Sequence, residues 1–362
     1  MTFVLSAIWL VTALYVCFML AYTVGWHRQK EYSPTASTAS NTIHRVSVVI
    51  PLRNESHNLP TLIASLQNQT YPNVEVLLVN DHSTDSTQSL IFGLNDSRFI
   101  PLNSPETSKK AALKCGIEHA GGTLILTTDA DAIIPPTWVQ TMVQAFFDRQ
   151  THLLIGPVTM QHGVTWQQIE HASLEGTTLG SAGIGLPVLC SGANLAFTPQ
   201  WYQACAPYLK PHVPSGDDMF MLQATILLKG QVRALKSTTA TVGISGEPTL
   251  KQFFTQRARW AGKATHYTAP SILCSATVVG LMQVAVVVSL ALSVLYPFLL
   301  CTLWCKFVID TCLVASVLTY HKKVRYVWYM PLLTLLYPFY ALGVCIMSLF
   351  PVSWKNRNVS SF

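Results

Sequence analysis

Residues 46–55, VSVVIPLRNE, decide the fold, because an apolar run rich in β-branched residues ends abruptly in proline, arginine and glutamate. A short apolar run bounded by polar residues predicts a buried β-strand. Residues 74–81, VEVLLVND, and residues 124–131, LILTTDAD, repeat the arrangement. Helix-length polar segments separate the three runs, which is typical of a largely parallel sheet with crossover helices. We therefore predict an α/β domain over residues 44–248.

The composition and four apolar regions predict a membrane protein. Half of the 362 residues are hydrophobic and 11% are charged, against roughly 25% charged in a typical soluble protein. Residues 1–26 can cross a hydrocarbon core of about 30 Å, and residues 269–352 hold three further apolar runs. Basic residues follow the first run and none precedes it, which favours a retained anchor over a cleaved signal peptide. We expect a polar linker at 27–43 and a cytosolic α/β domain on the plasma or inner membrane.

The topology of the last apolar run stays open. Alternating spans place residues 321–325, HKKVR, in the cytosol, as the positive-inside rule prefers, but they place residues 354–357, WKNR, outside. Pro338 lies in the middle of that run and removes a backbone donor. A bent or re-entrant hairpin is therefore the alternative to a full span, followed by a tail at 353–362.

The charge pattern argues against a nucleic-acid-binding protein, and the cysteine pattern argues against a disulfide-stabilised one. The formal charge of +6 is small and includes basic groups beside apolar runs, so we expect a membrane partner and no nucleic acid. The nine cysteines form no CxxC pair, and six lie in apolar segments, where we expect them to be reduced and structural.

Polar residues follow the first two predicted strands. Pro51, Arg53 and Glu55 end the first, and Asn80 and Asp81 end the second. Ligands of open α/β sheets bind beyond the carboxyl ends of the strands, so these residues would suit a nucleotide base and ribose. An ordinary turn with a helix N-cap is the alternative interpretation.

Asp129 and Asp131 follow the third strand at positions i and i+2. Two carboxylates at a strand end can reach one hard cation, and Mg²⁺ or Mn²⁺ prefers oxygen ligands while keeping positions open for phosphates. We predict a divalent metal site there that compensates a departing diphosphate. The alternative is a surface turn with two solvated carboxylates.

Asp217 and Asp218 precede an apolar helical pattern, where acids cap a helix or one of a pair acts as a general base. Residues 249–268 then form an amphipathic helix with Gln256, Arg259 and Trp260 on one face. Its default role is that of an interfacial helix. A guanidinium near the metal would instead bind a diphosphate through two hydrogen bonds.

Two weaker signals complete the predicted site. Lys109 and Lys110 open a helix-like stretch, and we take Lys110 as a phosphate-binding candidate, although a solvated helix start looks the same. Gly192, Ala193 and Asn194 bring small residues together, which lets a substrate approach the backbone, as loose turns also do.

As an ordered set, these motifs resemble those of membrane-bound inverting glycosyltransferases of family 2, which have the glycosyltransferase-A fold, a Rossmann-like mixed sheet. The likeness covers residues 44–268 and consists of VSVVIPLRNE, VNDHSTDS, TTDADA, SGAN, SGDD and QRARW. It implies that Glu55 and Asp81 contact the nucleotide. It also implies that Asp129 and Asp131 are the DxD pair, with Asp131 as the main metal ligand.

The same resemblance implies that Asp218 is the catalytic base and that the SGAN segment lines the acceptor side. Gln256, Arg259 and Trp260 match the QxxRW motif, which holds the donor diphosphate and the acceptor. Two departures concern His82, where the family often has glycine, and Asp217, where it often has glutamate.

We therefore expect a hexosyl transfer from a nucleotide-sugar, with UDP preferred, to a membrane-proximal lipid or glycan acceptor. A small processive polysaccharide synthase is the alternative, since QxxRW is typical of such enzymes. A nucleotide-binding transporter would need ionisable residues along its spans, and only Lys306 and Asp310 lie in the middle of one. A catalytically dead sugar-binding scaffold conflicts with the intact set of acids.

Overall fold

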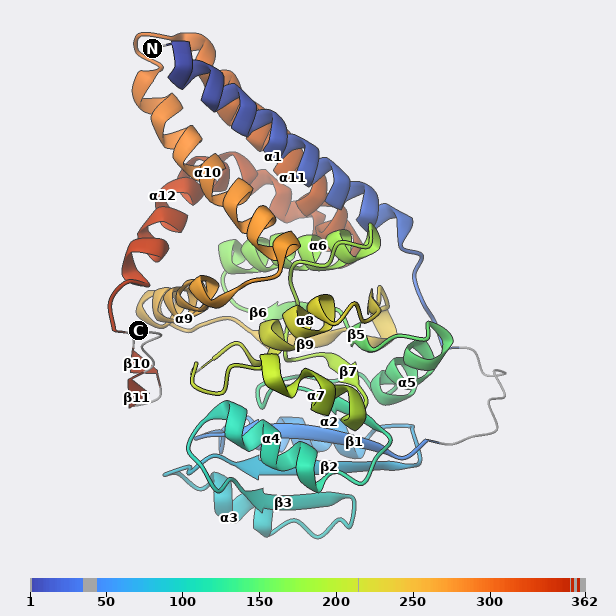
Figure 1. The fold of residues 1–362 in the computed structure, drawn as a ribbon. Helices are drawn as coiled ribbons and strands as arrows, with labels where there is room; N and C mark the ends of the chain where they lie inside the picture. The colour runs from blue at the N-terminus through green and yellow to red at the C-terminus, as the bar shows by residue number, and fades with distance from the viewer. Residues whose placement is uncertain (1, 35–43, 214, 352, 355–356, 359–362) are drawn as a thin grey trace.

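The structure is a computed structural model that describes residues 2–34, 44–213, 215–351, 353–354 and 357–358. An α/β domain forms one end of the molecule and a bundle of apolar helices forms the other (Figure 1). Most of the predicted linker and of the predicted tail lies outside the described residues, although residues 27–28 belong to the first helix.

Seven strands form the central sheet in the order β3-β2-β1-β4-β7-β5-β8. Strand β7 runs antiparallel to both of its neighbours, and the other pairs are parallel. The sheet is therefore mixed, as the family resemblance implied. Its strands are β1 (Val46–Leu52), β2 (Val74–Asn80), β3 (Phe99–Asn103), β4 (Leu124–Thr127), β5 (Leu153–Ile155), β7 (Leu195–Phe197) and β8 (Val232–Ala234). A second, two-stranded sheet pairs β6 (Val158–His162) with β9 (Val242–Ser245).

Both faces of the sheet are buried, which explains why its strands are continuously apolar. Val48 and Ile50 pack into one core with α2 (Leu59–Gln67) and α5 (Trp138–Asp148). Val49 packs into the other core, with α4 (Lys109–His119), α6 (Thr165–Gly183) and α8 (Asp217–Leu227). Successive residues of β1 thus face opposite sides, as the period of two requires. The remaining helices of this domain are α3 (Thr87–Phe92), α7 (Pro199–Cys205) and α9 (Leu250–Gly262).

The register of the strands brings their polar ends to one edge. Leu52 is paired with Asn80, and Val49 is paired with Thr127. Because β1, β2 and β4 are parallel, the residues that follow them all emerge at the same edge of the sheet. Leu195, at the start of antiparallel β7, is also paired with Thr127, so the segment before β7 arrives there as well.

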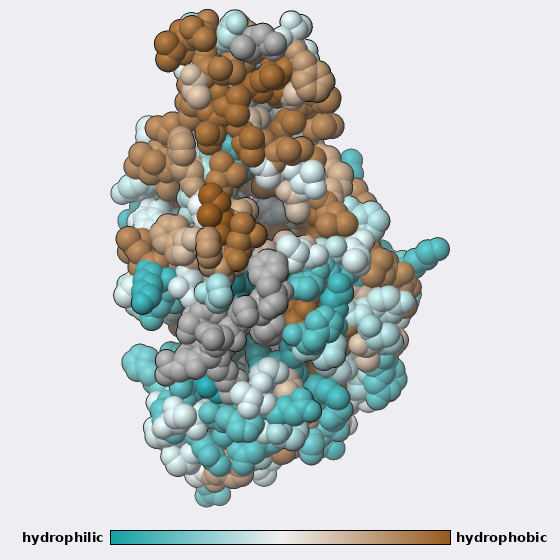
Figure 2. Space-filling model, turned by 60° about the vertical axis from the view of Figure 1, so that its left-hand side comes forward, coloured by the Kyte–Doolittle hydropathy of each residue, from teal (hydrophilic) through white to brown (hydrophobic). Residues whose placement is uncertain are grey.

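Among the residues that the structure describes, four helices are long and apolar enough to cross a membrane, and they cluster at the hydrophobic end of the molecule (Figure 2). They are α1 (Thr2–Arg28), α10 (Pro270–Leu292), α11 (Leu300–Tyr320) and α12 (Met330–Met347), the last two with short 3-10 extensions before them. All nine cysteines are free.

Helix α6 of the α/β domain packs directly against this bundle, where it contacts α1 and α11 (Figure 1). A Cβ atom at Gly25 of α1 would clash with the carbonyl oxygen of Gly180 in α6, and one at Gly180 would clash with the backbone of Tyr22. The two backbones are therefore in direct contact, which only glycine allows. This close packing fixes the first apolar helix against the α/β domain.

Helix α12 does not reach the far end of the bundle, where α1 begins (Figure 1). Lys323, before this helix, donates to the carbonyl of Met160 over 2.7 Å, and Tyr340, within it, donates to Glu170 over 2.7 Å. Both partners belong to the α/β domain, and β10 (Ser353–Trp354) then lies against α9. Pro338 lies inside this one helix, so the alternative of a hairpin broken at that residue is not what the structure has.

Candidate active site

One cavity of about 1920 Å³ brings together most of the predicted site residues. They come from the ends of β1, β2 and β4, the segment before β7, the start of α8, and α9. The predicted residues that line it are Pro51, Arg53, Glu55, Asp81, Asp129, Asp131, Gly192, Ala193, Asp217, Asp218, Gln256, Arg259 and Trp260. Lys110 and Asn194 are absent from its lining. The expectation that distant acids meet beyond one sheet edge is thus met for Asp81, Asp131 and Asp218.

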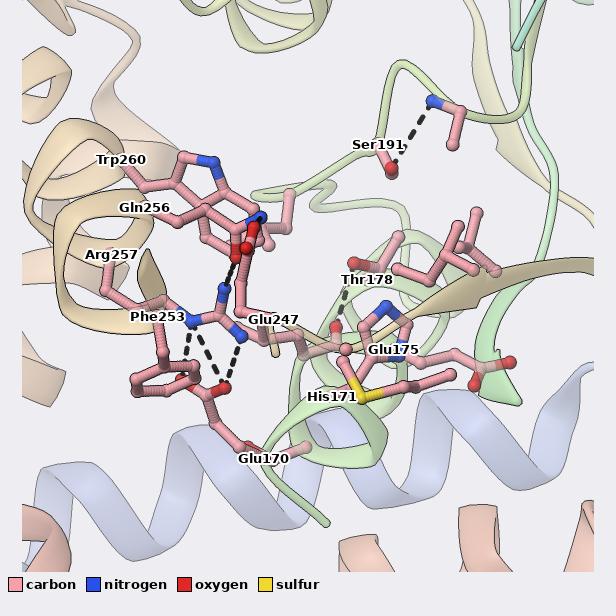
Figure 3. Close-up of a pocket in the computed structure, with 18 of the residues that line it drawn as sticks. Glu170, His171, Glu175, Thr178, Ser191, Glu247, Phe253, Gln256, Arg257 and Trp260 are labelled. Atoms are coloured by element: carbon pink, nitrogen blue, oxygen red, sulfur yellow. Dashed lines mark hydrogen bonds and ion pairs between the residues drawn. The ribbon is translucent and has the colours of Figure 1, made fainter. Parts of the chain in front are cut away.

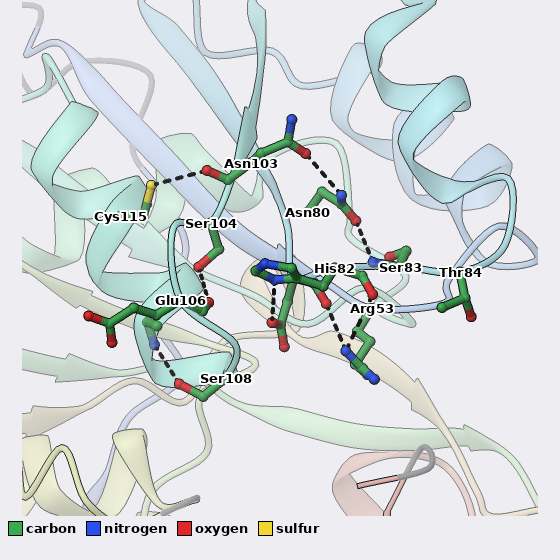
Figure 4. Close-up of polar contacts among 12 residues, drawn as sticks. Arg53, Asn80, His82, Ser83, Thr84, Asn103, Ser104, Glu106, Ser108 and Cys115 are labelled. Atoms are coloured by element: carbon green, nitrogen blue, oxygen red, sulfur yellow. Dashed lines mark hydrogen bonds and ion pairs between the residues drawn. The ribbon is translucent and has the colours of Figure 1, made fainter.

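Hydrogen bonds join the loop after β1 to the loop after β2 (Figure 4). Arg53 donates to the backbone carbonyls of Asp81 and His82 over 3.0 and 3.4 Å. Burial raises the pKa of Asp81, and the charges of Arg53 and His82 oppose that rise. His82 has a φ of 52°, a left-handed conformation that glycine adopts at no cost. This backbone geometry accounts for the glycine that the family often has at this position.

Asp129 and Asp131 lie close to a third carboxylate, Glu55. Burial, followed by the charges of Asp129 and Glu55, raises the pKa of Asp131 to about 6. Mutual repulsion of buried carboxylates is relieved by a bound cation, and oxygen ligands suit Mg²⁺ or Mn²⁺. The donor set therefore fits such an ion. Among the described residues, no three His, Cys, Asp or Glu side chains are grouped tightly enough to hold a metal by themselves.

Of the two neighbouring lysines, Lys109 lies among the acids, although Lys110 was taken as the phosphate-binding candidate. The Nζ atom of Lys109 lies 2.6 Å from Asp129 Oδ1. Burial lowers the pKa of this ammonium, but the charges of Asp129, Asp217 and Asp218 outweigh burial and raise it. Lys110, the predicted phosphate ligand, donates instead to the carbonyls of Leu209 and Lys210. The helical phase was the signal available, since successive helix residues point about 100° apart and only one of the two lysines can face the strand ends.

Asp218 lies at the N-terminus of α8, where several hydrogen-bond donors surround its carboxylate. Its carboxylate accepts from the backbone N–H groups of Met219 (2.7 Å) and Gly192 (3.3 Å) and pairs with Lys263 at 3.4 Å. Burial raises the pKa of Asp218, but Lys263, Lys109 and the two N–H groups reverse that effect and lower it. The carboxylate is therefore ionised at neutral pH. Lys263 follows α9 and was not among the predicted site residues.

Helix α9 supplies the polar residues of another wall of the cavity (Figure 3). Gln256 donates to Glu247 over 2.5 Å and accepts from Arg257. The guanidinium of Arg257 pairs with Glu170 of α6 and lies 4.2 Å from the ring centre of Trp260. Arg257 thus fixes both Gln256 and Trp260 in position. Burial lowers the pKa of Arg259, against the charges of Asp217, Asp218 and Asp129, which places that guanidinium beside the acids.

Asn194 is fully buried, and its side chain is used inside the fold. It accepts from Trp138 Nε1 at 2.9 Å and donates to the carbonyls of Pro157 and Ala240, each at 2.9 Å. These contacts fix the loop that presents Gly192 and Ala193. A direct contact of Asn194 with a substrate, as the resemblance implied, is not what this geometry favours.

Comparisons with known proteins match part of the α/β domain to one family model. Residues 47–202 match the model described as "Glycosyl transferase family 2". The chain is 31% identical over 114 residues to glycosyltransferase GlyG of Streptococcus pneumoniae, covering 31% of this chain and 38% of that protein. It is 34% identical over 142 residues to undecaprenyl-phosphate 4-deoxy-4-formamido-L-arabinose transferase of Enterobacter sp., covering 36% and 41%. The chain spans less than half the length of the curated relatives it matches.

One solved structure resembles nearly the whole chain. The mannosyltransferase PcManGT from Pyrobaculum calidifontis, in complex with GDP-Man and Mn²⁺, is similar over 96% of this chain and 99% of its own, with a TM-score of 0.59 and 17% identity. This likeness extends the shared fold beyond residues 47–202 to the apolar helices.

Proposed function

We propose that the protein is a membrane-bound inverting glycosyltransferase, because residues 47–202 match the glycosyl transferase family 2 model and the chain has a glycosyltransferase-A-like fold. It transfers a hexosyl unit from a nucleotide-sugar, with UDP preferred, to a lipid-linked acceptor at the cytosolic surface of the plasma or inner membrane. The observation that supports this proposal most strongly is one cavity. Its lining extends from Asp81 and Asp131 at the sheet edge to Tyr337 in an apolar helix. Donor and lipid can therefore meet without the lipid leaving the membrane.

The donor occupies the sheet edge in this proposal. Asp81, Arg53 and Glu55 take the nucleoside, at the place where α/β sheets bind such ligands. Asp129 and Asp131 would hold Mg²⁺ or Mn²⁺, which supplies charge compensation for the departing diphosphate.

The cationic side chains of the chain assist on the same side of the cavity. Arg259 is close to Asp129 and both α8 acids. A buried guanidinium there binds phosphate oxygens with paired hydrogen bonds. Pre-oriented charge of this kind stabilises negative charge as it develops on the leaving group.

Asp218 is the general base. The low pKa of its carboxylate keeps it ionised, so it can take the proton of an acceptor hydroxyl. That hydroxyl oxygen then attacks the anomeric carbon from the face opposite the diphosphate, the bond to the diphosphate breaks, and the anomeric configuration inverts. Positioning both reactants supplies much of the rate, and base catalysis adds a factor of about 10²–10⁴.

The test uses detergent-solubilised protein, total membrane lipid and a panel of radiolabelled nucleotide-sugars. We expect one donor to be consumed with Mn²⁺ or Mg²⁺ and label to enter the lipid phase. A single product size distinguishes single transfer from processive synthesis. If the donors remain intact, or if Asp218→Asn protein transfers label at the wild-type rate, the proposal fails.

A further inference from the structure

The cavity continues into the apolar helices, and its wall there is polar. We call six lining residues from four helices the membrane subsite: Tyr15 of α1, Gln283 of α10, Lys306 and Asp310 of α11, and Thr334 and Tyr337 of α12. Polar and ionisable groups inside a membrane are costly, so such groups mark a functional site by default. None of the site residues discussed above belongs to this set.

The charged members of the subsite neutralise each other. Lys306 is 2% exposed and forms an ion pair with Asp310 one turn along α11, while Tyr15 donates to Asp310 over 2.6 Å. The ammonium also lies 5.3 Å from the ring centre of Tyr337. An ammonium has three N–H donors. Its pairing with Asp310 therefore leaves donors for a ligand without leaving a net charge.

Two other members are buried polar groups whose oxygen atoms make no hydrogen bond within the described protein. They are Gln283 Oε1, in a residue 2% exposed, and Thr334 Oγ1, in a residue 4% exposed. The Gln283 amide nitrogen is used, since it donates to the carbonyl of Val279 over 2.9 Å. Leaving such an atom unpaired costs about 1–3 kcal/mol. A ligand that pairs with both atoms would recover that cost.

Helix association explains only part of this arrangement. Polar side chains often join membrane helices by hydrogen bonds, and the contact of Tyr15 with Asp310 is of this kind. The side-chain oxygens of Gln283 and Thr334 make no hydrogen bond to another helix among the described residues, yet both side chains line the cavity. They are therefore placed for an occupant of the cavity.

Aromatic and polar contacts connect this subsite with the catalytic end. Tyr337 packs against Tyr340 with ring centres 5.4 Å apart, and Tyr340 donates to Glu170. Glu170 pairs with Arg257, which contacts Gln256 (Figure 3). One occupant can therefore extend along this wall from the membrane helices to α9.

We propose that the membrane subsite binds the polar linkage groups of a nonionic lipid acceptor, namely the carbonyl and hydroxyl groups that join its two hydrocarbon chains to its reacting headgroup. Lys306 and Thr334 donate to a carbonyl oxygen, and Gln283 accepts from an amide N–H or from a second hydroxyl, which ceramide has and diacylglycerol lacks. A polyprenyl phosphate has only hydrocarbon below its phosphate and would leave these buried atoms unpaired. The inference rests on the proposed function and selects the acceptor class for the same cavity.

Two variants remove the unpaired atoms with little change in volume, Thr334→Val and Gln283→Leu. Matched controls are Thr302→Val and Ser289→Ala, because those hydroxyls are also buried, unpaired and on apolar helices but do not line the cavity. Each protein is given radiolabelled donor and vesicles that contain diacylglycerol, ceramide or undecaprenyl phosphate. Transfer to lipid, hydrolysis of the donor and nucleotide affinity are measured separately.

We expect label in ceramide, with KM for that lipid raised about two- to tenfold by Thr334→Val and by Gln283→Leu. Any transfer to diacylglycerol should respond to Thr334→Val and not to Gln283→Leu. Donor hydrolysis, nucleotide affinity and both control variants should stay at wild-type values. Transfer to undecaprenyl phosphate that neither variant changes would overturn the inference and leave the proposed function standing. Equal effects of test and control variants would also overturn it. Absence of donor consumption with every lipid would instead count against the proposed function itself.

Discussion

Replacing Lys109 with methionine tests the electrostatics of the site. The Nζ atom lies 2.6 Å from Asp129 Oδ1, and the two side chains are 30% and 33% exposed. Exposed pairs contribute about 0–1 kcal/mol, whereas breaking a buried pair costs about 3–5 kcal/mol. At this partial burial we expect Lys109→Met to lower the free energy of unfolding by about 2–3 kcal/mol. That loss corresponds to a Tm roughly 3–4 °C lower in a chain of this size.

A divalent cation should restore much of the lost stability, because it neutralises the same carboxylates. Lys110→Met is the control, since the neighbouring ammonium is bound to the backbone carbonyls of Leu209 and Lys210 and does not line the cavity. The assay is thermal unfolding of the detergent-solubilised protein with and without Mn²⁺. Stabilisation by Mn²⁺ should be larger for Lys109→Met than for the wild type and unchanged for Lys110→Met. Equal Mn²⁺ effects in both variants would refute the placement of Lys109 among the acids.

Three further predictions concern the base, the metal and pH. Asp218→Asn should lower kcat about 10²–10⁴-fold with nucleotide affinity retained, and an unchanged kcat in single-turnover assays would remove its role. Asp131→Asn should abolish the dependence of donor consumption on added Mn²⁺ after EDTA treatment, and a wild-type metal titration would contradict that. Burial, aided by the charges of Arg257 and His321, lowers the pKa of His171 to about 3. Unfolded His binds protons below about pH 6.5 while His171 stays neutral, so stability should fall by about 2–3 kcal/mol between pH 6.5 and 4.5. The Tm of His171→Gln protein should vary less with pH, and an identical Tm profile would show that another group is responsible.

The strands and their polar ends were predictable because burial on both faces of the sheet leaves a strong sequence signal. The predicted runs that start at Val46, Val74 and Leu124 correspond to β1, β2 and β4. The strand order and the antiparallel direction of β7 were not predictable from local pattern, since pairing depends on contacts distant in sequence.

The site residues that were missed or differently placed share one physical reason. Polar type and spacing indicate that a residue can serve in a site, but the direction of its side chain depends on helical phase and on neighbours from other elements. Lys109 and Lys110 differ only in that direction. Asn194 looked like a substrate ligand because its partners, Trp138 and the carbonyls of Pro157 and Ala240, are distant in sequence.

The membrane end of the chain posed a different problem. Hydropathy predicts that a segment is apolar enough to span, and α12 meets that criterion. It does not predict whether the helix crosses or returns, because both courses bury the same side chains in lipid. The contacts of Lys323 and Tyr340 with the α/β domain were equally unpredictable from hydropathy, because their partners are distant in sequence.

Electron paramagnetic resonance of bound Mn²⁺ tests the central claim most directly, with a nucleoside diphosphate whose terminal phosphate is enriched in the magnetic isotope of oxygen. The protein should bind the ion and the nucleotide together, and the labelled oxygens should broaden the Mn²⁺ lines. The double variant Asp129→Asn, Asp131→Asn should lose the bound signal. Tight Mn²⁺ binding with unbroadened lines, or binding that survives in the double variant, would contradict a cation held between these carboxylates and the donor diphosphate.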